Sequence, residues 1–126
     1  MLAESPLYAV IPVSDLQEAR RFYEEVLGIP PVRESETEIL YRAGDTRFAL
    51  YPSEDAGSAR HTLGSFIVED IEAVVAELRW RGVGFEDYDL PELKTVEGIA
   101  RLGPDKVAFF KDPSGNILAL VQEDVF

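Results

Sequence analysis

Hydrophobic residues recur at two different spacings along the chain, which predicts short strands and two helices. The first helix has its apolar residues at helical spacing, at Leu16, Ala19, Phe22, Val26 and Leu27. Ser14, followed three residues later by Gln17, is expected to cap its start, and Gly28 with Pro30 ends it. The second helix has its apolar residues at Ile71, Val74, Val75 and Leu78. Asp70 is its expected N-cap, and Gly82 its end.

Short apolar or alternating segments predict strands between these helices. They lie at residues 8–13, 37–52, 62–68, 83–88, 106–111 and 116–121. The segment 37–52 contains Gly44 and Asp45 between two alternating runs and is therefore expected to form a hairpin. Near the end of the chain, the turn "DPSGN" leads into a strand that is apolar on both faces. One face of that strand must pack under a helix, and the other must face a second sheet or an apolar pocket.

The predicted elements repeat once. Val13-Ser-Asp-Leu recurs as Val68-Glu-Asp-Ile at an offset of 55, and "FALYP" at 48–52 is echoed by "LALVQ" at 118–122 at an offset of 70. The sequence therefore predicts two βαβββ modules, with about 15 additional residues in the second. The insertion is placed near residues 88–104. A lid over a pocket and a hairpin extension or dimer contact are equally compatible with it.

Composition and charge limit the classes of function. With 126 residues, 46% hydrophobic and 29% charged, the chain is expected to form one soluble domain over residues 5–123. The modules are predicted at about 5–55 and 61–123. A net charge of −12 argues against nucleic-acid binding. No apolar run is long enough to span a membrane, and no signal peptide is evident, so a cytoplasmic location is expected.

The repeated plan, "RFYEEVLG" in the first helix and "FFKDPSGNILAL" at the last hairpin together resemble the vicinal oxygen chelate superfamily. That group includes glyoxalases, extradiol dioxygenases, fosfomycin-resistance proteins and bleomycin-binding proteins. The resemblance covers roughly residues 5–123 and is greatest to small glyoxalase-like or bleomycin-resistance-like members. It implies an α+β fold in which the two modules form a cupped mixed sheet with helices on its outer face. It also implies a homodimer.

The resemblance further implies where a metal would be held, on the first and last strands of each module. These positions fall at Tyr8, Leu63, Ala49 and Ala119. Alanine and leucine have no ligand atom, and a neutral phenol binds divalent metals poorly at pH 7. The chain also lacks cysteine and has a single histidine, His61, so a site with two imidazoles cannot form within one chain. No metal and no cofactor are therefore expected.

The candidate ligand-binding residues follow from period two along the strands that face the cup. They are Tyr8, Arg47, Tyr51, His61, Ser65 and Phe109. Core packing is the commoner use of such aromatic residues, and a partly solvated loop is the commoner setting for His61. A cup-facing Arg47 would favour an anionic ligand, whereas the acidic net charge would not.

These observations favour a metal-free protein that binds a small organic ligand in an apolar cup. The alternative is a metal-dependent lyase or isomerase of the glyoxalase type that uses His61 and carboxylates. A metal-free enzyme on the same scaffold is a third reading, and the catalytic residues are not identified. Fold resemblance does not choose among these functions.

Overall fold

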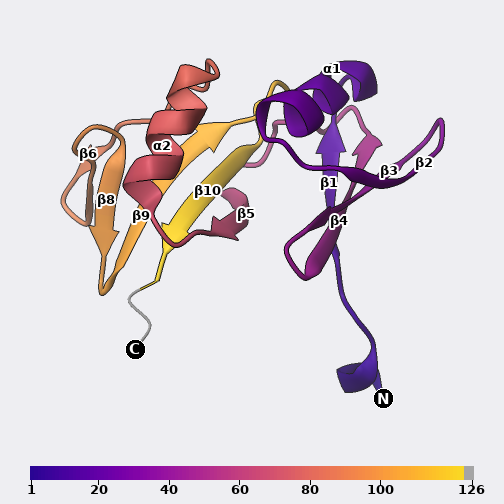
Figure 1. Cartoon of the computed structure of the whole chain (residues 1–126), viewed down its shortest axis with the longest axis horizontal. Coiled ribbons are helices and arrows are strands. Elements are labelled where there is room, and N and C mark those ends of the chain that lie inside the picture. Colours follow the sequence, from indigo (N-terminus) through magenta and orange to yellow (C-terminus); the bar gives the residue numbers. More distant parts are fainter. Residues whose placement is uncertain (124–126) are drawn as a thin grey trace.

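The computed structural model describes residues 1–123, and it contains two four-stranded sheets that lie side by side, each with a helix on one face (Figure 1). After a short 3-10 turn, η1 (Leu2–Glu4), the first sheet has the order β1-β4-β3-β2. Its strands are β1 (Ala9–Val13), β2 (Pro31–Glu34), β3 (Ile39–Ala43) and β4 (Thr46–Pro52). The second has the order β5-β10-β9-β8. Its strands are β5 (Thr62–Ile67), β8 (Ile99–Leu102), β9 (Asp105–Lys111) and β10 (Ile117–Gln122).

The two sheets repeat one topology, as the sequence predicted. In each sheet the first and last strands of the module are parallel, and the remaining pairs are antiparallel. Val10 pairs with Ala49, and Ser65 pairs with Ala119. These pairs reproduce the sequence offsets of 55 and 70, so the α+β architecture with two duplicated modules is confirmed.

The first helix differs from its prediction at both its start and its middle. Asp15, not Ser14, is the N-cap of α1 (Leu16–Arg20), because its carboxylate accepts hydrogen bonds from the backbone of the first turn. The helix continues as a π-helical segment, η2 (Arg21–Val26), which ends with a hydrogen bond from Leu27 N to Phe22 O. Tyr23, four residues after the buried Ala19, is fully buried, whereas the neighbouring Phe22 that the sequence analysis selected is only partly buried.

The second helix follows its prediction closely. α2 (Ile71–Trp80) begins after Asp70, whose carboxylate accepts a hydrogen bond from Ala73 N at 3.2 Å. Ile71, Val75 and Leu78 are its buried residues. Trp80, near the helix end, is 87% exposed. Among residues 1–123, no helix is both long and apolar enough to cross a bilayer.

The hydrophobic core lies on the helix-facing side of the two sheets and is continuous between the modules. It includes Val13, Tyr23, Leu50, Phe110 and Leu118, which are all buried, and 12 other buried residues. A second set of buried apolar residues lies outside this cluster, at Leu40, Ala49, Ala100, Val107 and Ala119. Strand alternation therefore buries apolar residues on the opposite face of both sheets as well, as expected from the all-apolar last strand.

The insertion extends the outer edge of the second sheet. The strand predicted at 83–88 is present only as an isolated bridge between Phe85 and Phe110, at one end of β9. The rest of β9 pairs with β8, which follows the inserted residues in the chain. Between the two parts lies a small hairpin, β6 (Asp89–Leu90) and β7 (Leu93–Lys94). Of the two readings of the insertion, the structure thus shows a hairpin extension.

The "DPSGN" turn does more than join two strands, because it connects the two modules. The Asp112 carboxylate accepts hydrogen bonds from Tyr23 Oη at 2.8 Å and from Asn116 Nδ2 at 2.9 Å. Asn116 Nδ2 also donates to Pro12 O at 2.7 Å, and Gly57 N donates to Asn116 Oδ1 at 3.1 Å. Asp112 and Asn116 are buried, so these bonds form inside the protein. Burial and the neighbouring carboxylate raise the pKa of Tyr23.

Ser14 belongs to this junction and not to the helix cap. Its backbone N–H donates to Ser114 Oγ at 2.9 Å, and the two hydroxyl groups lie 3.2 Å apart. The first helix therefore starts one residue later than the capping-box pattern predicted, because the serine hydroxyl is used between modules.

Candidate functional site

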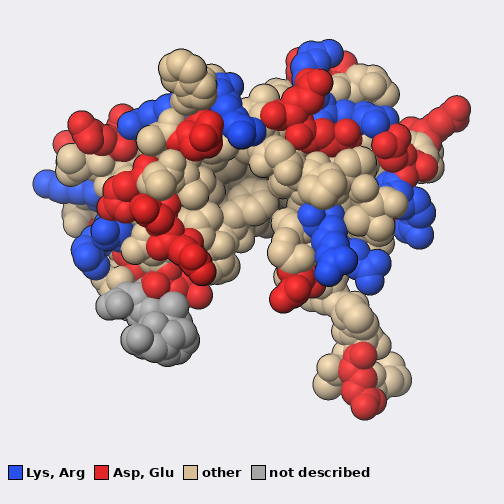
Figure 2. Space-filling view, in the orientation of Figure 1, with Lys and Arg blue, Asp and Glu red and all other residues tan. Residues whose placement is uncertain are grey.

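A cavity of about 510 Å³ lies between the two sheets, where the edge strand β1 of the first faces the edge strand β5 of the second. Figure 2 shows the surface hollowed between the modules. Within residues 1–123, β1 pairs only with β4 and β5 only with β10. The sheets thus do not join at this point, and the space between their edges leads from solvent toward the core.

The inner end of the cavity is apolar. It is lined by buried or partly buried side chains that belong to the core or pack on it, namely Ile11, Tyr23, Phe48, Phe66 and Leu118. Because the Tyr23 hydroxyl is already bonded to Asp112, its ring is the part that remains for contact with a ligand. An apolar body placed here would be removed from water, which is the main favourable contribution to binding in such sites.

The outer end carries the polar groups. Tyr8 comes from the segment leading into β1, Asp45 and Arg47 from the β3–β4 hairpin, and Ser65 from β5, and all four are exposed. The cavity therefore offers hydroxyl, carboxylate and guanidinium groups around an apolar interior. Such an arrangement orients a molecule that has one polar and one apolar end.

Three of the six residues predicted to contact a ligand, Tyr8, Arg47 and Ser65, line this cavity together. They come from three separate segments, the approach to β1, β4 and β5, which the module repeat brings to one place. Arg47 lies at the rim, exposed to solvent, which is one of the settings expected for an unburied cation.

The other three predicted residues, Tyr51, His61 and Phe109, do not line the cavity. Tyr51 lies at the far end of β4 and is 36% exposed. Phe109 packs edge-on against Tyr88, with ring centroids 5.5 Å apart. His61 is exposed just before β5, with Nδ1 3.2 Å from the carbonyl oxygen of Thr62.

A β-bulge explains why reasoning from strand alternation placed His61 and Leu63 on the cup face. The register of β5 and β10 shifts between Ile117 and Leu118, so Leu63 packs against the hydrophobic core. The extra residue reverses the alternation for everything before Gly64. Leu63 is therefore not on the cup-facing side with Ser65. His61, which was expected to face the same side as Leu63, is not on the cup-facing side either.

The residues at the positions where the resemblance implies metal ligands do not fit a metal ion. Ala49 and Ala119 are buried methyl side chains, and the first-strand residues that pair with them are Val10 and Ser65 rather than the predicted Tyr8 and Leu63. Together these four side chains present only one hydroxyl group and no imidazole or carboxylate, the usual ligands of divalent metals. Elsewhere in residues 1–123, no three His, Cys, Asp or Glu side chains are grouped so as to hold a metal.

Period-two reasoning missed several lining residues for one reason. Ile11 and Phe48 point to the core side of their strands, and Tyr8 and Arg47 to the other side. The cavity contacts residues of both faces because it lies beyond β1, the free edge of the first sheet, and not over one face of that sheet.

Comparison with known proteins agrees with this architecture. The family model described as the Glyoxalase/Bleomycin resistance protein/Dioxygenase superfamily matches residues 5–120. No curated protein matches the chain.

Solved structures share the fold across nearly the whole chain. A glyoxalase family protein from Enterococcus faecalis is 25% identical, with 97% of this chain and 100% of that chain covered and a TM-score of 0.72. TnmS3, an antibiotic-binding protein from Streptomyces sp. CB03234, is 23% identical, with 98% and 100% covered and a TM-score of 0.69. The fosfomycin resistance protein FosX from Mesorhizobium loti is 18% identical, with 97% and 94% covered and a TM-score of 0.68. Because the family model extends over almost all of the duplicated βαβββ fold, the chain belongs to the Glyoxalase/Bleomycin resistance protein/Dioxygenase superfamily.

Proposed function

We propose that this protein binds a small organic molecule, without a metal ion, in the cavity between β1 and β5. The observation that carries the proposal is the amphiphilic lining of that cavity, apolar where it meets the core and polar at its rim. Its volume of about 510 Å³ lies in the range of small-molecule sites, about 300–1,000 Å³. The ligand would insert an apolar or aromatic body and leave a polar group near Tyr8, Arg47 and Ser65.

The metal-free part of the proposal is supported by the buried methyl side chains of Ala49 and Ala119, which stand where the resemblance implies last-strand metal ligands. A binding role is also consistent with the printed description of TnmS3 as antibiotic-binding, although that likeness carries the fold and not the ligand. Nothing in the arrangement of His61 favours the lyase alternative, since it lies outside the cavity lining.

We also propose that the protein is a homodimer that uses the face carrying Tyr8 and Val10. Val10 and Ile67, on the two edge strands, are 52% and 63% exposed. Light scattering should give a mass of two chains for the wild type. The double variant Val10→Glu, Ile67→Glu should give the mass of a single chain. Val32→Glu, at an equally exposed position on β2, should leave the dimer intact. A wild-type monomer at tens of micromolar concentration would exclude this interface.

The binding proposal is tested by a thermal-shift screen of small aromatic compounds followed by titration. A compound present at 100 times its Kd stabilises the folded state by about 2.7 kcal/mol, which is readily detected. Ser65→Phe, which fills the cavity from β5, should abolish binding, and Arg47→Gln should weaken it. Arg42→Gln is the matched control, since Arg42 pairs with Arg47 across the hairpin but does not line the cavity. Hits whose affinity is unchanged by Ser65→Phe would place binding elsewhere.

A further inference from the structure

A second cavity, of about 610 Å³, lies at the opposite edge of the second sheet from β5, between α2 and the strands β7 and β8. It shares no lining residue with the cavity between β1 and β5. In the sheet order β5-β10-β9-β8, three strand spacings of about 4.8 Å separate the two edges. The two cavities are therefore separate sites.

The charge of this second cavity is opposite to that of the protein. Four of the 12 Lys and Arg residues line it, at Arg79, Lys94, Arg101 and Lys106. Only two of the 24 acidic residues do, Glu72 and Glu97, so the lining has a formal charge of +2 in a chain of net charge −12. Figure 2 shows Lys and Arg side chains gathered at the outer edge that β6 and β8 form in Figure 1. This local reversal of sign favours an anionic ligand.

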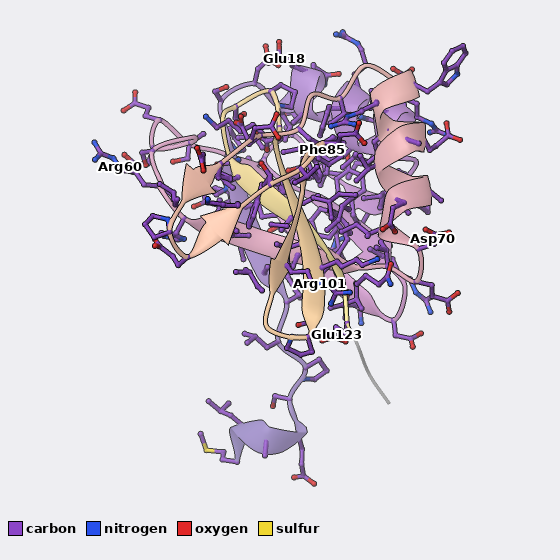
Figure 3. The ribbon with its side chains drawn as sticks, turned by 90° about the vertical axis from the view of Figure 1, so that its left-hand side faces the viewer. Glu18, Arg60, Asp70, Phe85, Arg101 and Glu123 are labelled. Atoms are coloured by element: carbon purple, nitrogen blue, oxygen red, sulfur yellow. The ribbon has the colours of Figure 1, made fainter. Side chains whose placement is uncertain are left out.

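Arg79 is held in place by neutral groups. It donates a hydrogen bond to Glu97 O at 2.9 Å, and its guanidinium carbon lies 5.6 Å from the centre of the Phe85 ring. Gly98 lies so close that an added Cβ would be 2.9 Å from Arg79 Nη2. These contacts fix the position of the guanidinium without neutralising its charge. Figure 3 shows Phe85 in the packed interior beside α2.

The inserted residues form a rigid wall for this cavity. The Asp87 carboxylate accepts hydrogen bonds from Thr95 Oγ1 at 2.9 Å and from Gly98 N at 3.1 Å, and Thr95 N donates to Tyr88 O at 2.9 Å. Glu97 has a φ of 53°, a conformation that is uncommon for residues other than glycine. This turn directs the Glu97 carbonyl to Arg79, so a strained residue positions the cation.

The floor of the cavity is apolar. Val75 and Ala100 are 3% exposed, Ile99 is half-buried, and Val96 at the rim is 75% exposed. From this floor and the cationic wall we infer a second binding site, for a small monocarboxylic acid whose carboxylate meets Arg79 and Arg101 and whose hydrocarbon body lies on the valines and Ile99.

The lining also explains why a monoanion with an apolar body is favoured over a polyanion. Lys106 is paired with Glu72 at 2.9 Å, so part of the positive charge is already neutralised. Glu72 and Glu97 would repel additional negative charges on a ligand. Lys94 is likewise paired with Asp89 at 3.8 Å. Arg79 and Arg101 donate to backbone carbonyl oxygens, Glu97 O at 2.9 Å and Pro104 O at 3.4 Å, so their charge is not neutralised. Their other N–H groups suit one carboxylate.

The test uses 4-phenylbutyrate as the probe and 4-phenylbutan-1-ol as its uncharged analogue, titrated into the full ¹⁵N-labelled chain. The acid should shift amide resonances in α2 and in residues 94–101, and it should do so equally in Ser65→Phe, in which the β1–β5 cavity is filled. The alcohol should bind at least about tenfold more weakly, since a hydrogen bond to a charged group contributes about 1.5–3 kcal/mol. Equal binding of acid and alcohol, or shifts confined to the β1–β5 cavity, would overturn the inference.

Two pairs of variants localise the interaction. Arg79→Gln should weaken binding of the acid about tenfold or more. Arg33→Gln, which removes an exposed arginine on β2, should leave it unchanged. Val96→Glu introduces a negative charge at a position too exposed to affect folding, so it should abolish binding, whereas Val96→Gln should retain it. Undiminished binding to Val96→Glu would show that the acid does not occupy this cavity.

Discussion

Tyr23→Phe removes a single hydroxyl from the junction between the modules and tests whether the Asp112 turn stabilises the fold. The hydroxyl donates a 2.8 Å hydrogen bond to Asp112 Oδ2, and both residues are buried. The substitution keeps the ring, which stacks with Tyr41 and packs edge-on against Phe22. Any loss of stability therefore reports on the hydrogen bond and not on core packing.

The expected loss follows from what remains around the carboxylate. A hydrogen bond to a charged group contributes about 1.5–3 kcal/mol. In the variant, Asp112 keeps three donors, namely the backbone N–H groups of Ser114 and Asn116 and the Asn116 side-chain amide. Because the carboxylate is not left without partners, a free energy of unfolding lower by about 2 kcal/mol is expected at pH 7.

The effect should depend on pH in a direction fixed by the raised pKa of Tyr23. Below about pH 10 the phenol is protonated in both states, and the hydrogen bond stabilises the fold fully. Above about pH 10 the unfolded tyrosine ionises while the buried one does not, so wild-type stability falls by up to about 1.4 kcal/mol per pH unit from this group. Phenylalanine has no such group, so the difference between variant and wild type should shrink by about 1.4 kcal/mol at pH 11.

The assay is urea unfolding followed by far-ultraviolet circular dichroism at pH 7 and pH 11. Tyr51→Phe is the matched control, since Tyr51 is more than one-third exposed, and it should change stability by less than about 0.5 kcal/mol. A neutral effect of Tyr23→Phe at pH 7, or a difference that does not narrow at pH 11, would refute the role assigned to this hydrogen bond.

Three further perturbations test other parts of the structure. Gly57→Ala should destabilise the protein by more than about 1 kcal/mol, because Gly57 has a φ of 76° and the added Cβ would collide with the Ser114 carbonyl. An unchanged midpoint of thermal unfolding would contradict this close approach. Asp70→Ala should cost about 1 kcal/mol by removing the N-cap of α2, and a loss below 0.3 kcal/mol would count against the cap. Ala49→Glu with Ala119→Glu should make thermal stability depend on added Zn²⁺, and no Zn²⁺-dependent gain would show that these positions cannot rebuild a metal site.

Sequence periodicity predicted most of the strands, the duplication and the second helix because these depend on local patterns, but it did not locate β2 or β8, and the strand predicted at 83–88 forms only a bridge at Phe85. Val13-Ser-Asp-Leu and its repeat mark equivalent strand–helix junctions, and the structure confirms the pairing they imply. Asp70 is followed by regular apolar spacing, so the cap could be identified directly. The first helix was less predictable, since its N-cap is Asp15 rather than Ser14 and its π-helical segment has no signature in apolar spacing.

The candidate site was only partly predictable because it depends on how two sheets meet. Alternation brings Tyr8, Arg47 and Ser65 to the cavity. It fails at Leu63, where a bulge reverses the facing of the chain, and at Phe48, which reaches the cavity around a sheet edge. Both exceptions arise from contacts between segments distant in sequence, which a pattern within one strand does not record.

Metal titration of untagged, chelator-treated protein tests the proposed metal-free binding function most directly. Calorimetry with Zn²⁺, Ni²⁺ and Mn²⁺ is expected to show no stoichiometric binding to wild type, because buried alanines stand at both last-strand positions where the resemblance implies metal ligands. Elemental analysis of the protein as purified should agree. One metal ion bound per chain, with affinity lost in His61→Ala, would contradict the proposal and favour a metal-dependent reaction in its place.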